Sequence, residues 1–500
     1  MNDIPSKLFD TPGYIPLKEY VHDIEHMQKN GPWKLPLRIG DRLHFFFLSL
    51  FAKFSWFSDV LTVVHPHIWS PSYTILINYL KGENLLEHVF ENNSKQKGFF
   101  SYTIKKSLMV RGDSLTMTGQ GIASDKSTAL SKALGEIIER MISGIGDLNK
   151  DILVASPEEV LQKYRVVYPP KYHRFLDIQR EKYPQLRCDT SSIMEWVCGS
   201  DLATNEKVYI PKQLTSWLGG TKTVEKRVSD FTSNGCAGYF TQEEASFRGL
   251  LEVVHRDGFF VHWLTMIAPR VIVHSTLPES IQKIIQEFEQ QGISLYVLDI
   301  TSLAIPSIYI AAINEKSEVP QVVLSGASAL TFEKAIRDGL TEMVMMVAEL
   351  SRENNNDLKE DTSEVPEPFI SNLNKYTRQS YWRRKEKIRQ FQWFVSGEKT
   401  SYEEIRKFDI SCGDSTSARI SACIHALGNI GEGYTPVVYY PKNPIQDELG
   451  FYVAQVYIPK AFSLYLREYM GTFDSDRLHE FATSKGVSKW ELNPLPHMFS

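Results

Sequence analysis

The sequence lacks the features that mark several large protein classes. It has five cysteines in 500 residues and no Cys-x-x-Cys pair, so neither a disulfide framework nor a zinc site is indicated. No run of apolar residues approaches the roughly 18 to 20 that cross a bilayer, and no cleavage-type signal is evident near the start. A net charge of −5 offers nucleic acid no general attraction. We therefore expect a cytoplasmic protein with no transmembrane segment and no nucleic-acid partner.

What the sequence does contain is typical of a large globular protein of the mixed α/β (α+β) class. With 42% hydrophobic and 23% charged residues, the chain can bury a large core. An acidic, asparagine-rich stretch at 352–368 is typical of a mobile surface loop. Hydrophobic patterns predict helices at 278–292, 332–350 and 417–427, and strands at 294–300, 307–313, 437–440 and 452–458.

Two acidic helical segments are the strongest chemical signal. In the first, Glu136, Glu139 and Arg140 stand at positions i, i+3 and i+4, so their side chains emerge on one face. The apolar stripe of the same helix comes from Leu134, Ile137, Ile138 and Met141. The carboxylates are therefore ordered along one side of a helix.

The second acidic segment begins with a glycine-broken loop at Asn234. It leads into a helix for which Thr241 is the expected N-cap residue. Glu244 and Glu252 are separated by close to two helical turns, and Glu252 and Arg256 lie at i and i+4. On spacing alone, the ordinary interpretation of both segments is a solvated face with intrahelical ion pairs.

Both segments resemble sequence motifs of the YcaO superfamily. The stretch 131–140 is similar to its S-A-L-G-E-A-I-E-R helix, and 233–257 is similar to its S-N-G-L-A-A-G-N-T-L-E-E-A … L-L-E-x-x-E-R-D segment, with no insertion or deletion. The resemblance implies a YcaO-like domain over 101–500, with the paired acidic helices packed on mixed sheets. Residues 1–100 fall outside it, and we expect them to form a mainly helical extension of unknown role.

The resemblance implies ATP-dependent activation of a peptide-bond oxygen. Members of the azoline-forming branch cyclise Cys, Ser or Thr side chains onto the preceding carbonyl, phosphorylate the product and eliminate phosphate. Mg²⁺ ions, which prefer hard oxygen ligands, would hold the triphosphate. Carried over position by position, the metal carboxylates are Glu136, Glu139, Glu244 and Glu252. The other residues that the resemblance places at the nucleotide are Lys132, Arg140, Asn234, His255 and Arg256.

Several positions depart from the family pattern. Lys132 stands at a usual Ser, Phe240 at an Asn and His255 at the last Glu of the second motif. Met345 begins a short apolar stretch where the family commonly carries Gln and Arg. Imidazole is a poor ligand for Mg²⁺, so His255 should weaken one metal position unless it contacts phosphate as a cation. Lys132 adds a positive charge that would partly compensate. The alternative is a pocket that has lost its nucleotide.

The C-terminal tail, 491–500, also resembles the family. Azoline-forming members often end in P-x-P-x-P, and this chain ends with Pro494, Pro496 and then Met498 in place of a third proline. Proline fixes φ, so the tail would be a stiff segment that enters a cleft at low entropic cost. We expect it to lie near the active site, with Pro494 and Pro496 contributing to catalysis.

The resemblance implies partners as well. The substrate would be a ribosomally made precursor peptide, and a separate ubiquitin-activating-enzyme-like protein would bind its leader, because no such domain is recognisable in residues 1–100. A homodimer is a further option. Two alternatives stay open: a scaffold or partner-binding subunit that has lost turnover, and a related reaction that forms a thioamide or amidine.

Three short matches point to other protein classes and carry less weight. Residues 112–115 and 476–479 match the G-D-S-L and D-x-x-H fragments of an esterase family, without its other blocks. Residues 219–223 lack the first glycine of a Walker loop. Residues 381–389 interleave basic and aromatic side chains, as single-strand binders do, although a solvated basic helix is the ordinary interpretation.

Overall fold

The computed structural model describes residues 89–92, 100–110, 113–123, 125–144, 147, 149, 151–216, 226–314, 322–350, 367–373, 378, 381–382 and 384–499. Residues 1–88 of the predicted helical extension lie outside the described residues, as do the Walker-like stretch at 219–223 and nearly all of the acidic loop at 352–368.

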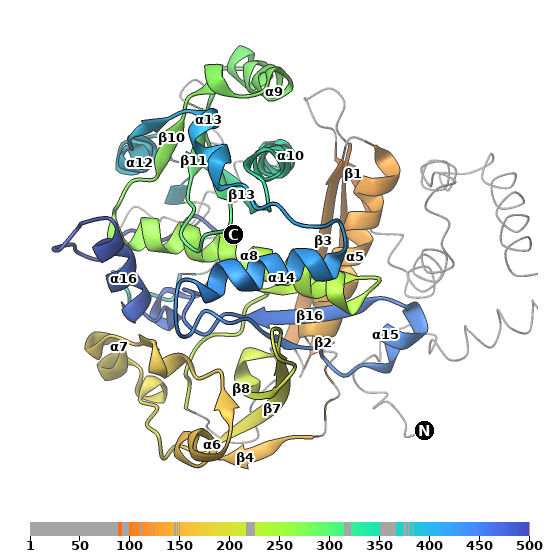
Figure 1. Ribbon diagram of the computed structural model, residues 1–500, viewed down its shortest axis with the longest axis vertical. Coiled ribbons are helices and arrows are strands. Elements are labelled where there is room, and N and C mark those ends of the chain that lie inside the picture. The colour runs from red at the N-terminus through yellow and green to blue at the C-terminus, as the bar shows by residue number, and fades with distance from the viewer. Residues whose placement is uncertain are drawn as a thin grey trace, which may run out of the picture. The chain divides into compact units, whose positions relative to one another are not determined.

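The described chain contains both helices and strands (Figure 1). The helices are α5 (Lys126–Gly144), α6 (Pro157–Lys163), α7 (Asp177–Lys182), α8 (Gln242–Thr265), α9 (Glu279–Gln290), α10 (Phe332–Leu350), α12 (Ile388–Phe391), α13 (Tyr402–Ile405), α14 (Thr416–Gly428), α15 (Pro444–Leu449) and α16 (Asp476–Ser484). The strands are β1 (Val89–Asn92), β2 (Phe100–Val110), β3 (Asp113–Ala123), β4 (Leu153–Ala155), β5 (Arg165–Val166), β6 (His173–Arg174), β7 (Met194–Asp201), β8 (Lys207–Pro211), β9 (Cys236–Tyr239), β10 (Arg270–Ile272), β11 (Ile293–Asp299), β12 (Ser307–Asn314), β13 (Val322–Ser328), β14 (Lys399–Thr400), β15 (Val437–Tyr439), β16 (Tyr452–Tyr457) and β17 (Asp474–Ser475).

The chain divides into two compact units. Among the described residues, the first unit consists of 89–141, 238–240 and 443–452, and the second consists of 142–237, 241–442 and 453–499. The first acidic motif therefore belongs to the first unit, and most of the second motif belongs to the second unit.

The first unit contains a three-stranded antiparallel sheet in the order β1-β2-β3, in which β2 and β3 pair over their whole length. Helix α5 packs closely on β3 because Gly119 and Gly121 carry no side chain. A Cβ atom at Gly121 would lie 2.0 Å from the carbonyl oxygen of Ala129 in α5. These glycines, which precede the first acidic motif, therefore permit the contact that places α5 on its sheet.

The second unit contains most of two larger sheets. One has five strands in the order β13-β12-β11-β10-β14, and the other has seven strands, with β5-β8-β7-β15-β16-β9 in order and β4 beside β7. Strand β12 is buried at every residue, and α10 packs against β12 and β13. This arrangement places the inner strands of the five-stranded sheet between helices.

Helix α8 is central to the core of the second unit. Thr241 caps it as predicted, because its hydroxyl accepts a hydrogen bond of 3.2 Å from the backbone N–H of Glu244. Helix α14 lies alongside α8, and α16 also contacts it (Figure 1). The half of α8 from Val253 onward is almost wholly buried, with Phe259 and Trp263 in a large aromatic cluster. The helix is therefore embedded in the unit and does not present one continuous solvated face.

The predicted mixed α/β class is confirmed. The structure has helices at Glu279–Gln290, Phe332–Leu350 and Thr416–Gly428, and strands at Ile293–Asp299, Ser307–Asn314, Val437–Tyr439 and Tyr452–Tyr457. Each lies within one or two residues of its predicted bounds. In the described part of the chain, no helix has the length and apolar character needed to cross a membrane.

Candidate functional site

The two carboxylates of α5 are held by backbone amides. Glu136 accepts a hydrogen bond of 2.6 Å from the N–H of Gln120 on β3, and its second oxygen accepts one of 2.5 Å from Arg140. Glu139 accepts a hydrogen bond of 3.0 Å from the N–H of Gly238. Backbone N–H groups orient a carboxylate without neutralising its charge. The side chain of Glu136 is 28% exposed, so it is accessible to a ligand.

Two of the departures from the family pattern lie in the same unit. The ammonium of Lys132 donates a hydrogen bond of 3.0 Å to the carbonyl of Ile122, at the end of β3. The ring of Phe240 packs edge-on against Phe451, with the centroids 5.4 Å apart. Phe240 therefore contributes apolar packing at a position where the family pattern has a polar Asn.

At the start of α8, Glu244 is enclosed by hydrogen-bond donors. One oxygen accepts a hydrogen bond of 2.7 Å from Arg419 and one of 3.0 Å from the hydroxyl of Thr416, both on α14. The other oxygen accepts a hydrogen bond of 3.2 Å from the Nε of Arg248, one turn further along α8. The side chain of Glu244 is only 11% exposed. Both of its oxygens are therefore already in use.

In the middle of α8, Glu252 and Arg256 form the predicted i, i+4 pair, but only loosely. The nearest oxygen and nitrogen atoms lie 3.6 Å apart, which is longer than a hydrogen bond. The guanidinium of Arg256 lies 4.2 Å from the ring centroid of Phe499, near the end of the chain. Arg256 therefore contacts both the carboxylate of Glu252 and the ring of Phe499.

His255, beside Arg256, is buried and stacked. Its ring lies parallel to that of Tyr309 on β12, with centroids 4.6 Å apart and an interplanar angle of 16°. Gly326 on β13 leaves room for it, because a Cβ atom there would lie 2.6 Å from the imidazole Nε2. Burial, aided by the Arg256 cation, holds the pKa of His255 well below its usual value. His255 is therefore neutral near pH 7 and does not offer phosphate a cation.

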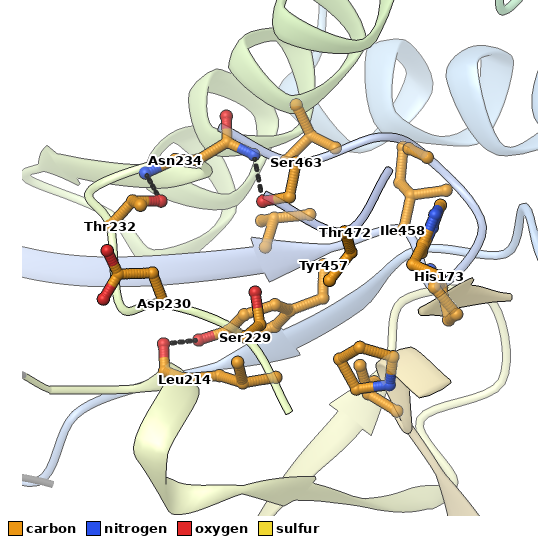
Figure 2. A pocket seen from close by; sticks show the side chains of 16 residues that line it. His173, Leu214, Ser229, Asp230, Thr232, Asn234, Tyr457, Ile458, Ser463 and Thr472 are labelled. Carbon is orange, nitrogen blue, oxygen red and sulfur yellow. Dashed lines mark hydrogen bonds between the residues drawn. The ribbon is translucent and has the colours of Figure 1, made fainter. Parts of the chain in front are cut away.

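Asn234 lines a small cavity in the second unit (Figure 2). Its amide donates a hydrogen bond of 3.1 Å to the hydroxyl of Ser463, and its backbone N–H donates one of 3.2 Å to Thr232. The cavity has a volume of about 60 Å³, well below the several hundred cubic ångströms of an ordinary ligand pocket. Asn234 here stabilises a loop, and its contact with a nucleotide stays a prediction.

The C-terminal tail is packed against the second half of α8. The N–H of Asn493 donates a hydrogen bond of 2.9 Å to the carbonyl of Leu264, and the indole N–H of Trp382 donates one of 3.0 Å to the carbonyl of Pro496. The tail continues to Phe499, whose ring contacts α8. The tail is thus ordered beside Arg256. The catalytic roles predicted for Pro494 and Pro496 stay predictions.

Three further residues of the second unit take part in charged or buried contacts that the sequence motifs did not assign. Asp257 is fully buried and accepts a hydrogen bond of 2.6 Å from Arg477 on α16. Asp257 belongs to the second motif, which marks it as a candidate, but the motif does not show that Arg477 is its partner. Tyr309 and Arg419 lie far along the chain from both motifs, so no spacing rule points to them.

The structure describes the segments of two of the competing short motifs. Ser114 lies within β3, opposite Met109 in an unbroken strand pairing. Tyr381 and Trp382 are buried in the aromatic core, so their rings are not available for stacking on bases.

Comparison with known families decides the assignment. The sequence model of a family described as YcaO cyclodehydratase, ATP- and Mg²⁺-binding, matches residues 120–461. This span is well over half of the chain and includes both acidic motifs. The chain belongs to the YcaO family. ATP and Mg²⁺, the cofactors predicted from the resemblance, are those of the YcaO family.

Solved structures show the same fold at low sequence identity. A heterocyclase in complex with substrate and cofactor is 20% identical, with a TM-score of 0.68 over 87% of this chain and 58% of that chain. The heterocyclase TruD is 20% identical, with a TM-score of 0.58 over 74% and 50% of the two chains. YcaO from Methanopyrus kandleri, bound with AMPPCP and Mg²⁺, is 17% identical, with a TM-score of 0.55 over 81% and 94%.

This chain thus matches 58% of the length of the first heterocyclase and 50% of the length of TruD. No curated protein matches it significantly.

The YcaO residues present here fit Mg²⁺ in their chemistry. Carboxylates are the hard ligands that Mg²⁺ prefers, and the side chains of Glu136 and Glu252 are each 28% exposed. In the described ranges, no three His, Cys, Asp or Glu side chains are grouped so that they could hold a metal ion. Mg²⁺ usually keeps several waters and takes phosphate oxygens as ligands, so one or two carboxylates suffice. The meeting of the two acidic helices at one metal site stays a prediction.

Proposed function

We propose that this YcaO protein is an ATP-dependent peptide cyclodehydratase. It would activate backbone amide oxygens by phosphorylation and form azoline rings from Cys, Ser or Thr of a ribosomally made precursor peptide. The observation that supports this most is the family match over 120–461 together with the ordered carboxylates of α5. Glu136 and Glu139 are each oriented by a backbone N–H, which is the preorganisation that a metal–phosphate site needs.

In this proposal, the acidic side chains hold the metal and the basic ones hold phosphate. Glu136, Glu139 and Glu252 would be the metal ligands, and bound Mg²⁺ would supply charge neutralisation at the triphosphate. Arg140 and Arg256 would contact phosphate oxygens, with Lys132 adding positive charge beside α5. Glu244 would join them only after releasing Arg419 or Thr416.

The tail would act on α8 and on the peptide. Asn493 and Pro496 fix its path along the helix, and Phe499 covers the guanidinium of Arg256. Because proline restricts the backbone, Pro494 and Pro496 would keep this path at low entropic cost. We propose that the tail lies beside the peptide during the reaction.

Calorimetry with Mg²⁺ and ATP tests the proposal. The wild-type chain should bind the nucleotide, and Glu136→Gln should weaken binding by about tenfold or more, because it removes a charged ligand from a dication. Glu287→Gln, at an exposed position on α9, is the matched control and should bind like the wild type. Absence of nucleotide binding by the wild type, with metal and partner present, would contradict the proposal.

A second candidate function is a YcaO-like scaffold that has lost turnover. Two observations favour it: both oxygens of Glu244 are occupied, and His255 is neutral and buried. A scaffold would bind the precursor peptide, or a separate leader-binding partner, as tightly as the enzyme would. Mass spectrometry separates the two functions, because only the enzyme removes one water per ring from a peptide containing Cys, Ser or Thr. A thioamide-forming reaction would instead exchange the amide oxygen for sulfur and raise the mass. An amidine formed with an amine of the same peptide would also lose one water, but it would require that amine instead of a Cys, Ser or Thr side chain.

A further inference from the structure

Three buried polar atoms without hydrogen-bond partners lie on neighbouring side chains of α8 and β12. They are the Nε2 of His255, the Nε of Arg256 and the hydroxyl of Tyr309. His255 and Arg256 are adjacent in α8, and the rings of His255 and Tyr309 are stacked 4.6 Å apart. All three side chains belong to the second unit.

Such a group is unusual in a folded core. Buried polar atoms are nearly always paired, because leaving one unpaired loses its hydration without compensation. The hydroxyl of Tyr309 gives the protein no packing benefit that phenylalanine would not give. A tyrosine at this position is therefore better explained by a ligand than by stability.

The charges of the three groups indicate which ligand they would accept. Burial holds the pKa of Tyr309 well above its usual value, so the hydroxyl keeps its proton and can donate it. Arg256 presents a cation, whose nearest contact with Glu252 is 3.6 Å and leaves its Nε without a partner. Two carboxylates, Glu252 and Glu342, also act on Arg256 and Tyr309. Donors beside a cation favour an anionic oxygen, and the two carboxylates would favour one that binds together with Mg²⁺.

The surrounding residues keep the group in place. Phe499 lies over Arg256 at 4.2 Å and has its ring centroid 5.9 Å from that of Tyr309. Gly326 leaves room for the imidazole of His255. Stacking thus contributes to holding the three side chains, while the His255 Nε2, the Arg256 Nε and the Tyr309 hydroxyl have no hydrogen-bond partner.

We propose that Tyr309 is a nucleotide-binding residue that donates a hydrogen bond to a phosphate oxygen of ATP, beside Arg256 and His255. The inference rests on the proposed function, and it adds to the site a residue from β12 that neither acidic motif contains. Strand β12 is buried along its whole length, so the hydroxyl is held by the core of the fold. The carbonyl oxygen of a peptide amide, the other oxygen acceptor in the proposed reaction, is uncharged and would gain less from Arg256.

Tyr309→Phe is a sharp test because it removes only the hydroxyl and keeps the ring that stacks on His255. We expect the variant to unfold at the same or a higher temperature than the wild type, since an unpaired buried hydroxyl is lost. We expect its affinity for ATP with Mg²⁺ to fall by roughly ten- to a hundredfold, the usual range for a hydrogen bond to a charged group.

Tyr381→Phe is the matched control. Tyr381 is also buried, but its hydroxyl donates 2.8 Å to Gln390. This variant should lose stability and keep its affinity for ATP. The two variants should therefore respond oppositely: Tyr309→Phe loses affinity for ATP and keeps its melting temperature, whereas Tyr381→Phe keeps its affinity and melts at a lower temperature.

The outcomes separate the two proposals. If wild type binds ATP and Tyr309→Phe binds it equally well, the role of Tyr309 is disproved while the proposed function stands. If the variant keeps its ATP affinity but reacts more slowly with peptide, the hydroxyl contacts the peptide and the phosphate assignment is wrong. If wild type binds no nucleotide, the proposed function fails, and this inference fails with it.

Discussion

Helices α5 and α8 carry related acidic motifs, but they hold their charged groups in different ways. On α5, the carboxylates of Glu136 and Glu139 each accept a hydrogen bond from a backbone N–H group, and Glu136 accepts a second one from Arg140. On α8, the carboxylate of Glu244 is bound by the guanidinium groups of Arg419 and Arg248. A backbone donor cannot move away or be exchanged, whereas an arginine side chain can.

The difference extends to burial. Glu136 on α5 is part-exposed, whereas α8 buries His255 and Asp257 among aromatic and aliphatic side chains. A buried charge must be paired, and breaking such a pair is strongly destabilising. Buried charged residues of α8 such as Asp257 therefore contribute to stability, whereas the part-exposed Glu136 on α5 contributes less to it. Substitutions on the two helices should thus have different consequences.

The largest effect is expected at Asp257. Asp257→Asn removes the partner of Arg477, whose guanidinium is also buried, and should lower the free energy of unfolding by about 3 to 5 kcal/mol. Glu136→Gln on α5, the comparison variant, should lower it by less than about 1 kcal/mol, because the pair with Arg140 is part-exposed. Urea unfolding followed by circular dichroism measures both. Equal losses of unfolding free energy in the two variants would contradict the view that charged residues of α8 contribute more to stability than those of α5.

The contrast between Asp257 and Glu136 also shows how far the sequence alone could go. Apolar periodicity and capping placed α8, α9, α10 and α14, because these signals depend on residues that are near one another in the chain. The motifs likewise placed Glu136 and Glu252 on helices. None of these local signals distinguishes an exposed carboxylate from a buried one.

The partners could not be predicted because they come from distant segments. Arg419 reaches Glu244 from α14, Tyr309 stacks on His255 from β12, and Phe499 covers Arg256 from the tail. Such contacts depend on how strands and helices are brought together by the whole fold. The interpretation of α8 as a solvated face, which follows from spacing alone, differs from the structure for this reason, since a pattern of charges does not show which residues pack on it.

A change of pH tests the burial of α8 with a smaller effect. The pKa of His255 is lowered by burial, so between its folded value and the ordinary value of about 6.5 the unfolded chain binds a proton that the folded chain does not. Stability from the neutral imidazole is fully present above pH 6.5 and is lost as the pH falls below it. In this pH range, one such histidine increases the slope of the unfolding free energy against pH by at most about 1.4 kcal/mol per pH unit.

His255→Gln should therefore reduce the slope of the unfolding free energy against pH, because about one proton fewer is taken up on unfolding. The stability of the variant at pH 8 does not enter this comparison. His425→Gln, at an exposed position on α14, is the matched histidine substitution with which the change of slope in His255→Gln is compared. Unfolding free energies measured from pH 7.5 down to 5.5, in steps, give the slope directly. An unchanged slope in His255→Gln would show that the imidazole is protonated in the folded state.

The smallest effect is expected for the pair of Glu244 and Arg419, which tests whether α8 can be made to resemble α5. A double-mutant cycle with Glu244→Gln and Arg419→Gln should give a coupling energy of about 1 kcal/mol, because the pair is partly exposed and Arg248 remains beside Glu244. If Glu244 changes partners when nucleotide binds, the coupling should fall once Mg²⁺ and ATP are added. A coupling that stays constant with nucleotide bound would mean that the pair is a permanent link between α8 and α14. Glu244 would then belong with Asp257 as a structural residue, and the metal ligands would come from Glu136, Glu139 and Glu252.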